Sequence, residues 1–186
     1  MHEQDKFVID LEAIRRRARE HMEAGPVTAG YKADSTEIVA LLNEALATEL
    51  VCVLRYRNHY FMAQGIAAEP VAAEFLEHAN EELEHADRIA NRITQLGGKP
   101  NMNPREIADA SASQYVESDD LLKMIAEDLV AERIAVDTYR EMITFVGASD
   151  PTTRRMLEEI LAVEEEHADD LAKLTVRVNS GLRHSA

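Results

Sequence analysis

The sequence is poor in several residue types that other classes of protein require. It contains one cysteine, Cys52, and no tryptophan among 186 residues. A single cysteine excludes an internal disulfide and is typical of a reducing compartment. Glycine and proline are also scarce, with 7 and 5 residues. Together with abundant alanine, leucine, glutamate and arginine, this composition favours helix over sheet.

Long apolar runs are absent as well. The chain starts with the polar segment MHEQDK, and no segment approaches the length of a signal-peptide core or a membrane span. We therefore expect a cytoplasmic protein with no membrane partner. Acidic residues outnumber lysine and arginine by 35 to 20, which gives a formal charge of −15. This balance argues against a nucleic-acid partner and suits a protein that gathers cations.

Turn signals divide the chain into a short charged helix and four long helices. Asp34 and Asp150 are predicted to be N-caps, and either Ser118 or Asp119 is predicted to cap the third long helix. The predicted helices cover residues 11–22, 34–64, 70–96, 119–147 and 151–178, with a crossover at 105–117 that contains a helical turn at 105–110.

The expected fold is therefore all-α. It is an antiparallel four-helix bundle with one long crossover and an extra N-terminal helix. We expect three regions: an N-terminal extension and linker at 1–30, the bundle at 31–178, and a C-terminal tail at 179–186.

Each long helix carries an apolar stripe at helical spacing that becomes polar near its middle. A buried carboxylate without a partner costs on the order of several kcal/mol or takes up a proton. The stripes contain no lysine or arginine, so metal ions are the remaining partners, and two divalent ions balance four carboxylates when the histidines are neutral. The candidate ligands among the polar residues of the stripes are Glu49, Glu82, His85, Glu132, Glu164 and His167.

The spacing of these residues supports a dinuclear site. Glu82 and His85 are three apart, as are Glu164 and His167, so each pair projects from one helix face. One glutamate from each of two helices, with a Glu-x-x-His pair from each of the other two, is the ligand set of dinuclear carboxylate bundles. Iron or manganese suits such ligands, and zinc could occupy the same site. A buried polar network without metal is the alternative.

The chain also repeats itself. ELVCVLRY (49–56) has a counterpart in ERIAVDTY (132–139), and ELEHAD (82–87) has one in EEEHAD (164–169). The two halves are therefore predicted to be hairpins that contribute equivalent ligands around a pseudo-twofold axis.

Together with LLNEALATELVCVLRY and EELEHADRIANRITQLGGKPN, these segments resemble the bacterioferritin-type members of the ferritin-like di-iron carboxylate family over about residues 38–175. The resemblance implies that Glu82 and Glu164 bridge two iron ions per subunit. It implies that Glu49 and Glu132 are terminal ligands and that His85 and His167 complete one iron each. The implied activity is a ferroxidase that oxidises Fe(II) with O2 or H2O2 and stores the product in a homo-oligomeric cage.

Two features depart from the bacterioferritin pattern. Leu83 stands where that family has a haem-ligating methionine, so no haem is expected. Only 19 residues follow His167, which leaves little room for the fifth helix of 24-subunit cages. With the longer crossover and the extra N-terminal helix, these features favour a dodecameric cage over a 24-mer.

Several residues near the six ligands have two open interpretations. Tyr56 is a candidate catalytic residue that, like Tyr139, could donate a hydrogen bond to a terminal glutamate or be oxidised, and core packing is the alternative. Asp128 could orient a ligand histidine, and a solvated or capping role is the alternative. His78 could lie on an iron path, although an ordinary buried histidine is favoured, and Cys52 is expected to be a small core residue.

Two other functions remain open at this stage. One is a di-iron or di-manganese peroxidase, catalase or oxidase without storage. The other is a DNA-protecting structural particle, for which the arginines at 15–17 and 19 are the only basic run. Acidic residues are interleaved with these arginines, which favours a salt-bridged surface helix.

Overall fold

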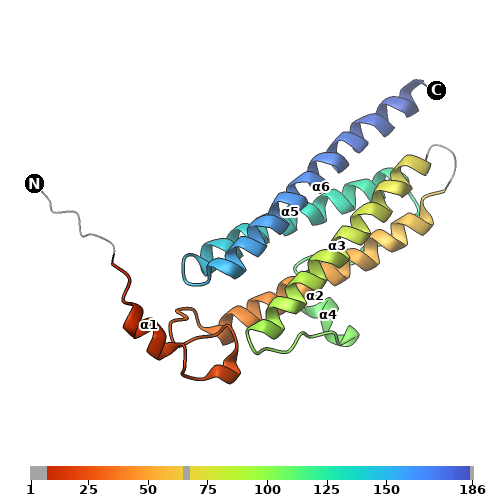
Figure 1. The fold of residues 1–186 in the computed structure, drawn as a ribbon. Coiled ribbons are helices and arrows are strands. Elements are labelled where there is room, and N and C mark those ends of the chain that lie inside the picture. Colours follow the sequence, from red (N-terminus) through yellow and green to blue (C-terminus); the bar gives the residue numbers. More distant parts are fainter. Residues whose placement is uncertain (1–7, 65–67, 185–186) are drawn as a thin grey trace, which may run out of the picture.

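The computed structural model describes residues 8–64 and 68–184, with side chains described as far as Val178. Within these ranges every regular element is helical. Four long helices form a bundle, in which α2 packs against α3 and α5 packs against α6 (Figure 1). The all-α four-helix architecture expected from the sequence is therefore confirmed. The bundle helices are α2 (Ser35–Met62), α3 (Glu69–Gln95), α5 (Leu121–Val146) and α6 (Pro151–His184).

The crossover between the two hairpins explains the direction of the helices. The chain leaves α3 at one end of the bundle and starts α5 at the other end, so α3 and α5 run in the same direction (Figure 1). The short helix α4 (Pro104–Ala110) lies within this crossover and packs against α2. It begins with Pro104 after the N-cap Asn103, whose side chain accepts a hydrogen bond from the Arg105 amide.

The N-terminal extension forms less helix than expected. The structure has α1 (Leu11–Arg17) and a separate 3-10 turn, η1 (Met22–Ala24), in place of one helix at 11–22. No side chain of α1 is buried, and a short helix without packing gains little from elongation. The described residues contain no ion pair between the α1 arginines and the interleaved acids, so the predicted salt-bridged helix is not observed.

Helix ends follow cap chemistry more closely than the predicted boundaries. The Asp34 side chain accepts from the amides of Thr36 and Glu37, as predicted. The N-cap of α5 is Asp120, which accepts from the Lys123 amide, and neither Ser118 nor Asp119. The last helix continues to His184, past the predicted end at 178. One glycine costs only about 1 kcal/mol in a helix, which does not stop a long helix that is already formed.

The core consists of two apolar clusters, one on either side of the polar middle of the bundle. One cluster includes Leu42, Ile89 and Leu157, and the other includes Phe75 and Leu171. The polar ligands predicted from the stripes therefore lie in a layer between the two apolar clusters. None of the helices in the described part of the chain combines the length and apolarity of a membrane-spanning segment.

A buried ion pair fixes the start of α6. The Asp150 side chain accepts from the Thr153 amide at 2.9 Å, as an N-cap does, and also from the guanidinium of Arg92 at 2.9 Å. Tyr31 of the N-terminal linker donates to the same carboxylate at 2.7 Å. Burial acts to raise the pKa of Asp150, but the hydrogen bonds from Thr153, Tyr31 and Arg92 outweigh it and lower the pKa to about 2. Asp150 thus joins α3, α6 and the linker.

We expect Asp150→Ala to lower the free energy of unfolding by about 3 kcal/mol, because it removes the only acidic partner described for the buried Arg92. The matched variant Asp120→Ala removes an exposed N-cap and should cost only about 1 kcal/mol. Urea denaturation measures both. Because the pKa of Asp150 is lowered in the folded state, its contribution should be complete above about pH 5 and should fall as the pH falls towards 2. Equal losses in the two variants would contradict this account.

Candidate metal centre

All six predicted ligands meet in the middle of the bundle. Each long helix supplies them from its core-facing side, and their exposed fractions lie between 0 and 3%. Glu49 comes from α2, Glu82 and His85 from α3, Glu132 from α5, and Glu164 and His167 from α6.

These side chains form two overlapping groups of potential metal ligands. In each group, one ligand atom per residue lies within 4.8 Å of all the others. Both groups contain Glu82 and Glu164, so these two carboxylates lie between the groups, where bridging ligands of a dinuclear site would lie. The first group adds Glu49 and His85, and the second adds Glu132 and His167.

The hydrogen-bonding state of these residues fits bound cations. Among the described residues, all buried side-chain polar atoms without a hydrogen-bond partner belong to the six ligands, apart from Asn58 Oδ1 and His59 Nε2. Buried polar atoms are normally hydrogen-bonded, and an unpaired buried charge is costly. Such a cluster of buried carboxylate oxygens and imidazole nitrogens offers its lone pairs to cations. The donor set of carboxylate and imidazole suits iron, manganese or zinc.

Both histidines direct Nδ1 towards the carboxylates. The contacts of His85 Nδ1 are Glu164 Oε1 at 2.9 Å, Glu49 Oε2 at 3.3 Å and Glu82 Oε2 at 3.5 Å. His167 Nδ1 lies 3.7 Å from Glu82 Oε1 and 3.8 Å from Glu132 Oε2. The other nitrogen of His167, Nε2, lies 2.7 Å from Glu81 Oε2. A carboxylate that accepts the second N–H of a ligand histidine fixes its ring orientation and tautomer.

Two tyrosines donate hydrogen bonds to Glu132 and Glu49 from the opposite half of the chain. Tyr56 donates to Glu132 Oε1, and Tyr139 donates to Glu49 Oε1. In both glutamates the other oxygen, Oε2, has no hydrogen-bond partner. Burial and the neighbouring carboxylates raise the pKa of both phenols well above the ordinary value, so both remain donors. Each tyrosine therefore orients a carboxylate with one oxygen held and the other free to ligate.

When no metal is bound, protons on the glutamates and histidines offset the negative charge of the site. Burial raises the pKa of Glu49 and Glu164 well above the ordinary value. Burial acts on Glu82 in the same direction, but its close contacts with Glu49, His167 and His85 outweigh burial and lower the pKa of Glu82. For the histidines, burial lowers the pKa, but the close contacts with the glutamates prevail and raise the pKa to about 10 for His85 and about 12 for His167.

Asp128 does not orient a ligand histidine, contrary to the sequence-based hypothesis. Its carboxylate accepts from Arg55 Nε at 2.8 Å and contacts His59 Nδ1 at 2.8 Å. Sequence reasoning overlooked Arg55, which is fully buried and also donates to the Gln114 carbonyl at 3.0 Å. Its position within the otherwise apolar run 51–56 was the available signal, because a buried arginine requires an acidic partner. Cys52 is a buried core residue, as expected.

The sequence analysis also missed the contacts of Glu81 and His78 with His167. Glu81 precedes a ligand directly, so helical spacing places it beside the core face, yet its side chain reaches back to His167. His78 is 2% exposed, and its ring stacks on that of His167 with centroids 4.0 Å apart. Burial, together with the nearby His167, lowers the pKa of His78 to about 4.

A four-helix bundle with two carboxylate–histidine groups that share two glutamates defines the class of dinuclear carboxylate proteins. Comparison with known families agrees with this class. Residues 39–180 match the ferritin family, described as a ferritin-like domain. This match covers most of the chain, and the chain belongs to the ferritin family.

Individual relatives are similar over most of their length. A nutrient stress-induced DNA-binding protein from a Synechococcus species is 30% identical over 74% of this chain and 80% of its own. A bacterioferritin from Mycobacterium tuberculosis is 30% identical over 73% of this chain and 81% of its own. Among solved structures, a dodecameric thioferritin from Bacteroides fragilis, a bacterioferritin-related protein, has a TM-score of 0.76 at 30% identity. The matched region covers 83% of this chain and 92% of the thioferritin chain.

Metal binding should release protons, because His85 and His167 are protonated at neutral pH when no metal is bound. We expect Zn²⁺ to displace at least about two protons per chain at pH 7, one from each Nδ1, and further protons from Glu49 and Glu164, whose pKa burial raises. Since the folded pKa values are about 10 and about 12, the apparent affinity should rise with pH throughout the neutral range. Titration in buffers of different ionisation enthalpy measures the proton count. Zn²⁺ affinity that is the same at about pH 6 and about pH 8 would contradict it.

Proposed function

We propose that this protein is a ferroxidase that oxidises Fe(II) at the centre formed by the six ligands and stores the ferric product in an oligomeric cage. One observation carries the proposal: two ligand groups share Glu82 and Glu164, and nearly all the orphaned buried polar atoms belong to them. Two Fe(II) ions fit this arrangement, as substrate, with two shared carboxylates between them. Manganese or zinc would be held by the same atoms.

In this mechanism the protein holds and balances charge. Glu82 and Glu164 stand between the two ligand groups, where a carboxylate can bind with one or two oxygens as the distance between the ions changes. Tyr56 and Tyr139 fix the terminal glutamates, and Glu81 fixes His167. The two apolar clusters keep water away on either side, which strengthens the interaction between carboxylates and cations.

The redox step balances with dioxygen or hydrogen peroxide as the oxidant. Two Fe(II) ions each give up one electron. Dioxygen takes both electrons and two protons to become hydrogen peroxide, or hydrogen peroxide takes both electrons and two protons to become two water molecules. A pair of iron ions supplies both electrons at one place, which is the chemical advantage of a dinuclear site. Tyr56 lies next to Glu132 and is the proposed additional redox-active side chain.

Storage is proposed from the relatives. Bacterioferritins are among them, and the thioferritin from Bacteroides fragilis is described as dodecameric. We propose a homo-oligomeric cage of the dodecameric kind for this chain. The charge of −15 supports accumulation of cations within such a cage. Native mass measurement of the iron-loaded assembly tests both the subunit number and the iron content.

The ferroxidase proposal predicts a strong effect of Glu82→Gln. This substitution keeps the size of the side chain but removes the negative charge shared by both groups. We expect the rate of rapid Fe(II) oxidation to fall at least about a hundredfold, and the burst of about two Fe(II) per subunit to disappear. Stopped-flow absorbance with anaerobic Fe(II) and oxygenated buffer measures both.

The matched control is Glu84→Gln on the same helix. Glu84 is exposed, and no hydrogen bond or ion pair of its side chain is described. It should leave the burst unchanged. Circular dichroism verifies that both variants fold. If Glu82→Gln oxidises Fe(II) as fast as the intact protein, the proposed site is wrong.

A peroxidase, catalase or oxidase without storage is the alternative use of the same centre. It is distinguished by the fate of the metal. Turnover of hydrogen peroxide without retained iron would favour this alternative, whereas retention of many iron ions per assembly would favour storage.

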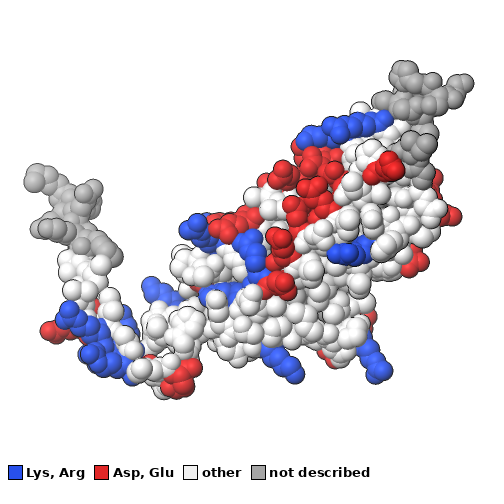
Figure 2. Space-filling model, turned by 45° about the vertical axis from the view of Figure 1, so that its right-hand side comes forward, with Lys and Arg blue, Asp and Glu red and all other residues white. Residues whose placement is uncertain are grey.

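DNA protection is a second candidate function. It is favoured by the DNA-binding relative and by the basic side chains of α1, none of which is buried and which lie at one end of the molecule (Figure 2). The acidic charge of the whole chain opposes it. A gel-shift experiment at physiological salt, with the intact chain and with Arg15, Arg16 and Arg17 replaced by alanine, decides the question.

A further inference from the structure

A second group of metal-ligating side chains lies beside the dinuclear centre. Glu74 and His78 stand one turn apart on α3, and Asp170 faces them from α6. One ligand atom from each of the three lies within 4.8 Å of the others. Glu74 and Asp170 are partly exposed, whereas His78 is buried. The group therefore opens to the surface on one side and borders the interior on the other.

The Nε2 atom of His78 faces Glu74. The other ring nitrogen, Nδ1, lies 3.2 Å from the Tyr56 hydroxyl, which donates to Glu132. Nε2 makes no hydrogen bond within the described residues, and Glu74 Oε1 lies 3.6 Å away. An imidazole nitrogen and a carboxylate oxygen that face each other in this way can both ligate one divalent cation.

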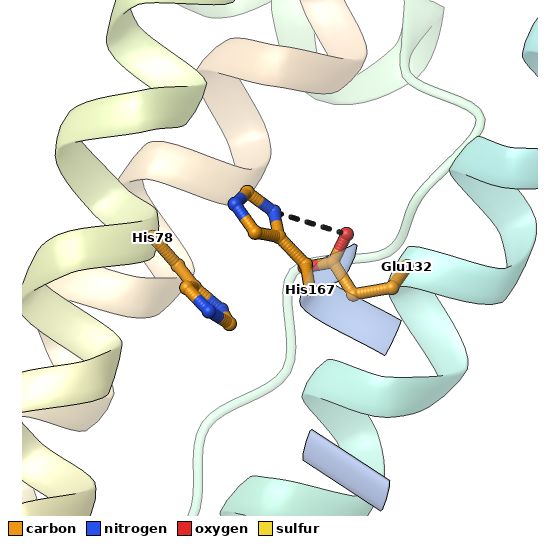
Figure 3. Close-up of side chains that lie close together, drawn as sticks. All are labelled: His78, Glu132 and His167. Carbon is orange, nitrogen blue, oxygen red and sulfur yellow. Dashed lines mark ion pairs between the residues drawn. The ribbon is translucent and has the colours of Figure 1, made fainter. Parts of the chain in front are cut away.

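His78 also connects this group to the dinuclear centre. Its ring stacks on the ring of His167, and together with Glu132 and His167 it forms a further group within 4.8 Å (Figure 3). In Figure 3 His78 projects from α3 and lies alongside His167, which forms an ion pair with Glu132. His78 therefore belongs both to an outer group, with Glu74 and Asp170, and to an inner group, with Glu132 and His167. The two groups are joined by this one imidazole ring.

The internal repeat does not account for this group. The positions in the second half of the chain that correspond to Glu74 and His78 are Met156 and Ile160, neither of which suits a divalent metal of the iron or zinc type. The six ligands recur in both halves because each half completes the same centre. The outer group occurs once, so it is not a by-product of the duplicated motif.

The surface around the group is acidic. Figure 2 shows acidic side chains gathered in a band along the bundle, leading towards the C-terminal end of α6. Partial burial and the negative charges of Asp170 and Glu77 raise the pKa of Glu74. Negative charges thus predominate here, although Lys173 Nζ lies 3.1 Å from Asp170 Oδ1. Such a surface raises the local concentration of cations.

We propose that Glu74, His78 and Asp170 bind a divalent cation and deliver Fe(II) from the acidic surface to the dinuclear centre through His78. This proposal rests on the proposed ferroxidase function for its delivery role. The binding site itself is tested without oxidation, with Co²⁺ as the probe, because Co²⁺ accepts the same carboxylate and imidazole ligands and is stable in air.

The first test is anomalous X-ray scattering from crystals soaked in Co²⁺. For the intact protein we expect peaks at the dinuclear centre and one further peak between Glu74, His78 and Asp170. The double variant Glu74→Gln/Asp170→Asn should lose only the further peak. A control variant, Glu84→Gln/Asp87→Asn, removes the same charge from exposed positions of α3 and should keep every peak. Occupied dinuclear positions with no Co²⁺ at the outer group in the intact protein would overturn the proposal.

The second test is the Fe(II) dependence of oxidation. Delivery predicts that Glu74→Gln/Asp170→Asn slows the initial rate roughly tenfold at low Fe(II), while the rates converge at high Fe(II) because the six ligands are intact. The control variant should follow the intact protein throughout. Equal rates for the double variant and the control at low Fe(II) would overturn delivery. Failure of the ferroxidase proposal looks different, because the intact protein would then show no burst at any Fe(II) concentration.

Discussion

The mutual repulsion of four glutamates buried in one layer is the constraint on which the rest of this structure depends. Each is at most 1% exposed, and water cannot screen their charges. Within the described residues, no lysine or arginine forms an ion pair with any of them. The layer is stable only with cations in it: protons on the histidines and carboxylates, or metal ions. The burial of apolar side chains in the two clusters offsets the energetic cost of this polar layer.

Pseudo-twofold repetition explains how the glutamate layer is built. The residues that depart from the repeat suggest how cations could reach this layer. Tyr56 and Tyr139 each donate to a buried glutamate of the opposite half, so neither hairpin orients its own carboxylate. His78 and Glu81 break this symmetry, and both contact His167. Within the described residues, the ligand group that contains His167 therefore has additional polar neighbours that have no counterpart beside His85.

Helical periodicity was sufficient to predict the bundle and to bring the six ligands together, because residues three or four apart on one stripe must share a face. It could not predict which side chains meet across helices. The pairing of Asp128 with Arg55 and His59, and of Glu81 with His167, depends on the rotation and separation of packed helices. Helix ends were predicted where a cap was unambiguous, as at Asp34 and Asp150. They were misplaced where several candidates adjoin, as at Ser118, Asp119 and Asp120.

Two irons that share Glu82 and Glu164 are the central expectation for this centre. Mössbauer spectroscopy of protein loaded with about two iron-57 ions per chain and then exposed to dioxygen tests this directly. Ferric ions that share bridging ligands couple magnetically, so the account predicts a spin-coupled diferric pair without magnetic splitting at low temperature in a weak field. A spectrum of isolated high-spin ferric ions at the same loading would contradict it.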